Sequence, residues 1–196
     1  MHRTLFTTPV VNRLLHAFSV WFFKRNGWKI VGSLPPGSEK CVVVAAPHTS
    51  NWDLPYGLML SFALDFNACW LGKVQLFKAP FGRLMMWFGG IPVQRDQTNK
   101  LVSGSASAIR EASGSLQLIV APEGTRSKTH TWKTGFYYIA LEARVPLVLA
   151  FLDYEKKIGG IGPMFRPSGD IEADMLIIRA FYAPIKGKNA DQFHAG

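Results

Sequence analysis

The chain has 196 residues, of which 48% are hydrophobic and 18% are charged, which is typical of a single globular domain with a sizeable core. Lys and Arg number 22 against 13 Asp and Glu, and the net charge of +9 indicates an anionic partner: nucleic acid, an anionic membrane surface or a phosphorylated substrate. Two cysteines, Cys41 and Cys69, lie in apolar runs and are expected to be buried free thiols, as in a reducing compartment; without histidines at metal spacing they exclude a zinc site. No cleavage site typical of a secretory signal peptide follows the first apolar stretch.

Residues 9–25 predict an amphipathic helix, because apolar side chains recur there at helical spacing: Val10, Val11, Leu14, Leu15, Phe18, Trp21 and Phe22. The stretch is shorter than the roughly 20 apolar residues that a membrane-spanning helix needs. Its apolar face can lie in a membrane interface, with Arg13, Lys24 and Arg25 at the lipid headgroups, or it can pack on the protein core. Because the basic residues of the chain accompany Trp, Phe and Leu, a membrane surface is favoured over nucleic acid.

The first motif follows residues 41–46, a short apolar run that ends at a proline and predicts a buried strand. His48 and Asp53 come next, five positions apart, whereas residues that share one face of a helix are three or four apart. The two side chains can meet if His48 lies in a loop and Asp53 begins the next helix. Pro55 favours this arrangement, because proline is tolerated in the first turn of a helix.

If the two side chains meet, the Asp53 carboxylate can accept a hydrogen bond from one ring nitrogen of His48 and so fix the tautomer. The other ring nitrogen is then free to take a proton from a substrate hydroxyl. The alternative is that Asp53 is an ordinary helix N-cap and His48 an ordinary loop histidine.

Apolar runs typical of strands alternate with helical patterns along the rest of the chain. Strands are expected at residues 66–71, within 89–95, at 116–121 and at 145–152. Helices are expected at residues 54–65, 81–88, 98–113, 134–143 and 171–182. We expect a hairpin turn at residues 159–163, where three glycines and a proline gather. The pattern predicts an α/β fold with a mostly parallel central sheet flanked by helices. We divide the chain into an N-terminal amphipathic helix with its lead-in (residues 1–32) and the α/β domain (residues 33–196).

The second motif is Pro-Glu-Gly-Thr-Arg-Ser at residues 122–127, directly after an expected strand. Backbone N–H groups, hydroxyls and a guanidinium in one loop suit a phosphate group. Arg95 and Lys73 also follow strands, so we expect them to join Arg126 at one sheet edge as substrate-binding residues. The alternative is that Arg126 is a solvated charge and Glu123 its structural partner.

Four ordered blocks resemble those of the glycerophospholipid acyltransferase family, which includes the 1-acylglycerol-3-phosphate acyltransferases. The matching blocks are the His48/Asp53 pair, the apolar stretch 90–95 that ends in Arg, the Glu-Gly-Thr-Arg-Ser of 123–127, and the Val-Pro strand at 145–148. Order and spacing agree from about residue 40 to residue 152. The second block departs from the family pattern, because Pro92 stands where Phe is usual and Gln94 where Asp is frequent.

The resemblance implies transfer of a fatty acyl group from acyl-CoA or acyl carrier protein to a hydroxyl of a lysophospholipid-type acceptor such as 1-acylglycerol-3-phosphate. It implies no metal and no bound cofactor. His48 is then the general base and Asp53 orients it, while Arg126 and Arg95 are candidates for binding the acceptor's phosphate. The resemblance also implies that the acceptor-binding loop consists of Glu123, Gly124, Thr125 and Arg126.

Two alternatives stay open: the same chemistry on another lipid hydroxyl, such as that of a glycolipid or an ornithine lipid, and a non-catalytic lipid-binding module. The expected partners are therefore an acyl thioester, a lysophospholipid and an anionic membrane surface, without nucleic acid. The expected location is peripheral, at the cytoplasmic face of a membrane.

Overall fold

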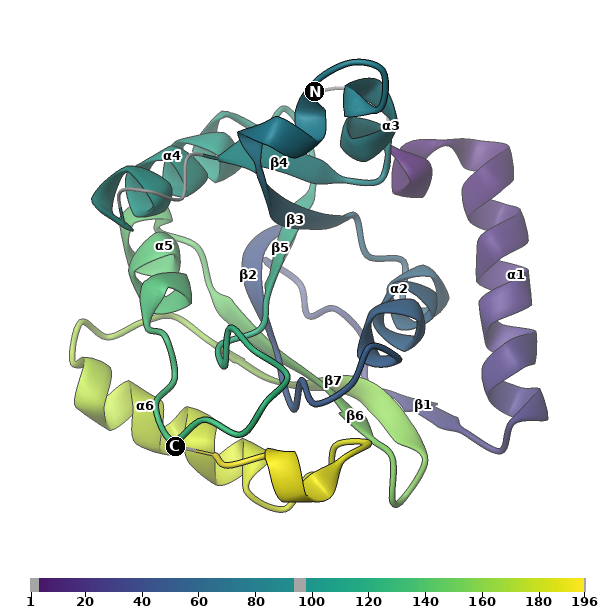
Figure 1. Cartoon of the computed structure of the whole chain (residues 1–196), viewed down its shortest axis with the longest axis vertical. Helices are drawn as coiled ribbons and strands as arrows, with labels where there is room; N and C mark the ends of the chain where they lie inside the picture. The colour runs from purple at the N-terminus through teal and green to yellow at the C-terminus, as the bar shows by residue number, and fades with distance from the viewer. Residues whose placement is uncertain (1–3, 94–97, 196) are drawn as a thin grey trace.

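The computed structural model describes residues 4–93 and 98–195, and within these ranges seven strands form one sheet (Figure 1). The strands are β1 (Lys29–Val31), β2 (Lys40–Ala45), β3 (Ala68–Lys73), β4 (Gly90–Val93), β5 (Leu116–Val120), β6 (Leu147–Asp153) and β7 (Ile158–Phe165). The α-helices are α1 (Pro9–Arg25), α2 (Asp53–Ala63), α3 (Gly82–Trp87), α4 (Thr98–Glu111), α5 (Gly135–Ala143) and α6 (Ile171–Tyr182). Short 3-10 helices are η1 (Leu5–Thr7), η2 (Val74–Phe77) and η3 (Ala190–Gln192). Every helix and strand that the hydrophobic pattern predicts is present, with its ends shifted by a few residues at most.

The strand order in the sheet is β1-β7-β6-β2-β5-β3-β4, and among these neighbours only β6 and β7 pair in antiparallel fashion. This confirms the predicted α/β fold with a mostly parallel sheet. Because β6, β2, β5, β3 and β4 run in the same direction, the loops that follow them leave from one edge of the sheet, where ligands bind in folds of this kind.

Helices cover both faces of the sheet (Figure 1). The side chains of β2 alternate between two cores: Val42 and Val44 pack with residues of α4, α5 and α6, whereas Cys41 and Val43 pack with residues of η1 and α2. All four are at most 1% exposed. A strand that is buried on both faces has no polar face, and this explains the unbroken apolar run of residues 41–46.

Helix α1 forms where the amphipathic helix is predicted, and it lies beside α2 at the periphery of the molecule (Figure 1). Phe23 is buried, and Val11 and Leu15 are half-buried against the core. A second apolar row remains 49% to 70% exposed: Val10, Leu14, Phe18 and Trp21. The helix therefore packs on the core with one side and presents apolar residues on another. No helix in the described part of the chain has both the length and the hydropathy needed to cross a bilayer.

The prediction of a hairpin turn at residues 159–163 is wrong. Strands β6 and β7 do form an antiparallel hairpin, but its turn occupies residues 154–157, and residues 159–163 lie within β7. The glycines there allow close packing instead of a turn: a Cβ atom on Gly160 would collide with Val31 of β1, and one on Gly162 would collide with the ring of Phe181. Glycine inside a strand is typical of such close approaches.

Strand β1 is an element that the hydrophobic pattern does not reveal. It consists of three residues, Lys-Ile-Val, and it pairs in parallel with β7 at the edge of the sheet. A segment of this length carries no readable periodicity, and its pairing depends on residues far along the chain. It lies in the segment that the sequence assigns to the lead-in, and the division of the chain at residue 32 stays a prediction.

Candidate active site

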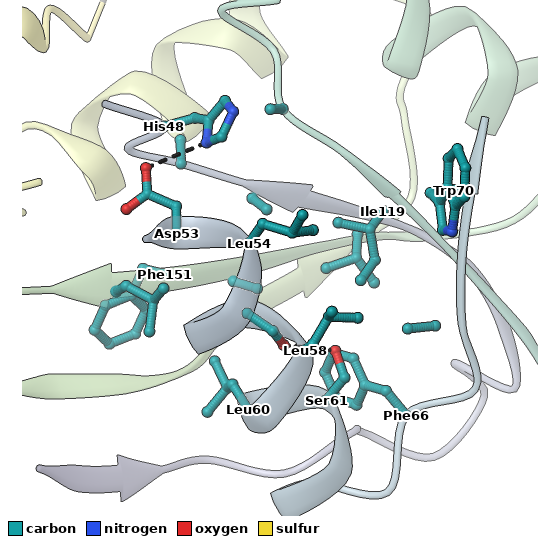
Figure 2. A pocket seen from close by; sticks show the side chains of 18 of the residues that line it. His48, Asp53, Leu54, Leu58, Leu60, Ser61, Phe66, Trp70, Ile119 and Phe151 are labelled. Carbon is teal, nitrogen blue, oxygen red and sulfur yellow. Dashed lines mark hydrogen bonds and ion pairs between the residues drawn. The ribbon is translucent and has the colours of Figure 1, made fainter. Parts of the chain in front are cut away.

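His48 and Asp53 face each other at the edge of the sheet to which β2 points (Figure 2). His48 follows β2 in a loop, and Asp53 is the first residue of α2, as predicted. The His48 Nδ1 atom lies 3.2 Å from Asp53 Oδ2, and the two side chains are 27% and 7% exposed. The N-cap position belongs to Trp52, so the alternative of Asp53 as an ordinary N-cap is wrong. The carboxylate faces the loop that contains His48, where it can hold the imidazole ring.

The Asp53 carboxylate accepts hydrogen bonds on both oxygens. In addition to His48, the backbone N–H groups of Thr49 and Ser50 donate to Oδ2 at 2.7 Å and 2.8 Å, and the Tyr154 hydroxyl donates to Oδ1 at 2.9 Å. Burial acts to raise the pKa of Asp53, but the hydrogen bonds from His48, Ser50, Tyr154 and Thr49 outweigh it, so the pKa lies below its usual value. Asp53 is therefore ionised at neutral pH, and the hydrogen bonds that the loop N–H groups donate to its carboxylate stabilise the conformation of the loop.

Glu123 connects the second motif to the first. Its side chain is buried, and Oε1 accepts a hydrogen bond of 2.8 Å from the backbone N–H of His48. Its other oxygen, Oε2, is buried without a hydrogen-bond partner among the described residues. Burial raises the pKa of Glu123, although hydrogen bonds from its own backbone and from that of His48 act against this. Glu123 thus supports the position of His48 through the backbone of the loop.

The rest of the second motif forms an exposed loop beside Glu123. Gly124 has a positive φ of 65°, which favours glycine, and a Cβ atom there would lie 2.9 Å from the Lys133 side chain. Thr125 and Arg126 are exposed. Lys133 is held next to this loop by its backbone N–H, which donates to the Pro122 carbonyl at 2.8 Å. A hydroxyl, a guanidinium and an ammonium group therefore lie on one short stretch of surface, a chemistry that suits a phosphate.

Of the two further predicted binding residues, Lys73 and Arg95, the structure describes the backbone of Lys73. Lys73 is the last residue of β3, which runs parallel to β5, so its backbone lies at the same sheet edge as the two motifs. Arg95 lies outside the described residues. Of the predicted site residues, the structure brings His48, Asp53 and Glu123 into direct contact.

The segment after α6 braces the loop of the first motif from the other side. The backbone N–H of Asn189 donates to Thr49 Oγ1 at 3.2 Å, and its side-chain amide donates to the Thr49 carbonyl at 2.8 Å. Gly187 lies so close that a Cβ atom there would be 2.6 Å from Thr49 Oγ1. The loop is thus fixed by contacts from three parts of the chain: Asp53 of α2, Glu123 after β5, and this final segment.

An apolar pocket of about 270 Å³ opens at the His48–Asp53 pair. It lies between α2 and the sheet, with the pair at one end and Phe66 towards the other (Figure 2). Besides the pair, its walls include Leu54, Leu58, Phe66, Trp70, Ile119 and Phe151. A pocket of this composition can take an extended apolar chain and leave the polar end of that chain beside His48. Among the described residues, no three His, Cys, Asp or Glu side chains are arranged to hold a metal ion.

Three residues of the site are absent from the sequence prediction: Tyr154, Lys133 and Asn189. Tyr154 follows β6, which lies next to β2 in the sheet, so the rule that ligand sites gather at strand ends could have identified it. Asn189 contacts a residue 140 positions away and Lys133 lies in an irregular loop, so neither carries a local signal.

Comparison with known proteins agrees with this geometry. The model of the Acyltransferase family matches residues 29–150, which is more than half of the chain. The fold is similar to that of the 1-acyl-sn-glycerophosphate (LPA) acyltransferase PlsC from Thermotoga maritima: the TM-score is 0.61 at 17% sequence identity, over 91% of this chain and 81% of that chain. A search of curated protein sequences gives no significant match. The chain therefore belongs to the Acyltransferase family and is an acyltransferase enzyme, which confirms the family resemblance seen in its sequence.

Proposed function

We propose that this protein transfers a fatty acyl group from an acyl thioester to a hydroxyl of a lysophospholipid such as 1-acylglycerol-3-phosphate. The observation that carries the proposal is the His48–Asp53 pair at the end of an apolar pocket. Family membership supplies the class of reaction. The choice of acceptor is supported by the solved structure with a similar fold, which is described as an LPA acyltransferase.

In the proposed reaction, His48 acts as general base. In the proposed starting state the imidazole is neutral: its Nδ1–H donates to Oδ2 of the ionised Asp53, and Nε2 carries no proton. Nε2 takes the proton from the acceptor hydroxyl while the hydroxyl oxygen attacks the thioester carbonyl carbon. When the C–S bond breaks, the proton on Nε2 passes to the leaving sulfur, which departs as a thiol. The products are an ester and a free thiol, and His48 returns to its neutral form.

The pocket is the proposed site of the acyl chain. Its lining is mainly apolar, and burial of an acyl chain there gains roughly 0.8 kcal/mol per methylene group. With the chain inside, the thioester carbonyl lies at the pocket mouth beside His48. The pocket has no feature that distinguishes acyl-CoA from acyl carrier protein, so both donors belong to the proposal.

The exposed loop at residues 124–126 and Lys133 are the proposed site of the acceptor's phosphate. Arg126 and Thr125 offer hydrogen-bond donors, and the Lys133 side chain lies against Gly124. Lys73, at the end of β3 beside β5, stays a candidate for the same phosphate, and so does Arg95 on the evidence of the sequence alone.

We further propose that the enzyme works at the cytoplasmic face of a membrane, where acyl thioester donors and lipid acceptors meet. The exposed apolar row of α1 is the surface that would enter the lipid interface. Lys24 and Arg25 in the last turn of that helix, together with the net charge of +9, favour an anionic bilayer.

The first test is thiol release from acyl-CoA and from an acyl carrier protein thioester, with a panel of acceptors that includes lysophosphatidic acid, a glycolipid and an ornithine lipid. His48→Ala should lower acceptor-dependent release by about 10²–10⁴-fold, because general-base catalysis is lost, while the melting temperature stays close to that of the wild type. His194→Ala, which removes an exposed imidazole that contacts the His130 ring, is the matched control and should keep its activity. Normal turnover by His48→Ala would overturn the mechanism, and vesicle binding without release from any donor would favour a non-catalytic lipid-binding module.

A further inference from the structure

Tyr154 contacts the catalytic pair from the side opposite to His48. Its hydroxyl donates a 2.9 Å hydrogen bond to Asp53 Oδ1, whereas His48 and the backbone N–H groups of Thr49 and Ser50 all bind Oδ2. Tyr154 thus holds the one carboxylate oxygen that the loop leaves free. It reaches this place because β6 and β2 are parallel neighbours in the sheet, so the residues that follow them lie at one edge.

The surroundings of Tyr154 fix the position of its hydroxyl. Its ring lies edge-on to Trp28 at 5.1 Å and next to Tyr56 at 5.6 Å between ring centroids. Its backbone N–H donates to the Lys186 carbonyl at 2.9 Å, and the Lys188 ammonium lies 5.6 Å from the ring centroid. Contacts with the segment between α1 and β1, with α2 and with the final segment therefore leave the ring little freedom to move.

We propose that Tyr154 is a positioning residue of the active site, which holds the Asp53 carboxylate in the rotation that keeps Oδ2 aligned with His48 Nδ1. The inference rests on the proposed role of the His48–Asp53 pair. Without the hydroxyl, Oδ1 at the buried end of α2 loses its donor, and the carboxylate can turn to share both oxygens with the loop N–H groups. When Nδ1 is held less firmly, the imidazole ring of His48 samples more orientations, and Nε2 faces the acceptor hydroxyl in a smaller share of them.

The protonation state of Tyr154 agrees with this role. Burial, and then the negative charge of Asp53, raise the pKa of Tyr154 far above its usual value. The phenol is therefore protonated over the whole pH range in which an enzyme would work, and it acts as a hydrogen-bond donor at every such pH.

The experiment compares Tyr154→Phe with Tyr56→Phe. Each change removes one hydroxyl from the same aromatic cluster, but of these two tyrosines it is Tyr154 whose hydroxyl donates to Asp53. Tyr154→Phe should lower kcat by about 10-fold and leave the KM values of donor and acceptor within about twofold, because the hydroxyl acts through the pair and not on the substrates. Tyr56→Phe should keep both kinetic constants and the melting temperature close to those of the wild type. Tyr154→Phe should stay folded but melt a few degrees lower, because the buried Oδ1 of Asp53 loses its donor.

A second measurement does not depend on turnover. The imidazole ¹H–¹⁵N resonance of His48, assigned with the His48→Ala variant, should shift or broaden in Tyr154→Phe and stay unchanged in Tyr56→Phe. An unchanged kcat together with an unchanged resonance in Tyr154→Phe overturns the inference, and equal loss in both variants assigns the effect to the aromatic cluster instead. If the wild type releases no thiol from any donor, the proposed function fails, and the resonance still decides whether Tyr154 positions His48 and Asp53.

Discussion

A single carboxylate organises the active-site loop. Asp53 accepts from His48, from two backbone N–H groups of the loop and from Tyr154, so the residue that orients the proposed base also shapes the loop that carries it. Spacing alone predicts that His48 and Asp53 can meet, because the residues between them suffice for a turn before a helix. The contact with Tyr154 spans 101 positions and has no counterpart in local sequence, so only the folded chain reveals it.

The lowered pKa of Asp53 has a consequence for stability. A carboxyl group whose pKa is lower in the folded than in the unfolded state contributes stability above its unfolded pKa, near 3.9, and this contribution disappears as the pH falls through the folded-state pKa. The free energy of unfolding of the wild type should therefore exceed that of Asp53→Asn at pH 7, and the difference should shrink as the pH is lowered from about 5 to about 3.

Urea unfolding at a series of pH values measures this difference. Glu155→Gln, which removes one exposed negative charge from the β6–β7 turn, is the control for the change in net charge. A difference between wild type and Asp53→Asn that stays constant from pH 7 to pH 3 would contradict the prediction.

At the scale of helices and strands, the sequence predicts what depends on neighbouring residues and misses what depends on distant ones. The strand at 41–46 and the helix at 9–25 follow from hydrophobic pattern alone. The glycines of residues 159–163 are misread as a turn, because the atoms that require them belong to β1 and α6, which are far away in sequence. The division of the apolar residues of α1 into a packed side and an exposed row is likewise set by the position of α2.

Helix α2 offers a test of the pocket as an acyl-chain site. Gly57 lines the pocket, and no atom lies within 4 Å of the place where its Cβ would be. Gly57→Leu should fill part of the pocket and shift the preference of the enzyme towards shorter acyl chains, while replacing a helical glycine adds up to about 1 kcal/mol of stability. The measurement is kcat/KM over a series of saturated acyl-CoA donors.

Gly104→Leu is the matched control for this change. Gly104 lies within α4 on the other face of the sheet, and its Cβ position is equally open. It should gain similar stability without any change in chain-length preference. The same chain-length profile in Gly57→Leu and the wild type would show that the acyl chain lies elsewhere.

For the molecule as a whole, charge and apolar surface act together. The exposed row of α1 accompanies a net charge of +9, so the enzyme should bind anionic vesicles through this helix. Replacing Leu14 and Trp21 by Glu should weaken binding to phosphatidylglycerol vesicles by at least about 10-fold and leave the melting temperature unchanged, because both side chains are mainly exposed.

The control pair lies on α6. Leu176 and Ile177 are 67% and 53% exposed, much like Leu14 and Trp21 at 66% and 59%. Replacing both by Glu makes the same change in charge and likewise removes two exposed apolar side chains, at another place on the surface. Equal loss of vesicle sedimentation in the two double variants would mean that α1 has no special part in membrane binding.

The brace that the final segment places on the active-site loop has a consequence for the newly made chain. Thr49 receives its two hydrogen bonds from a residue that is translated 140 positions later. At the usual rate of about 5–20 residues per second, the ribosome needs on the order of ten seconds to add them. During that interval the proposed base and its carboxylate are already synthesised but not yet locked in place, so we expect acyl transfer to begin only after Asn189 has been translated and has left the ribosome.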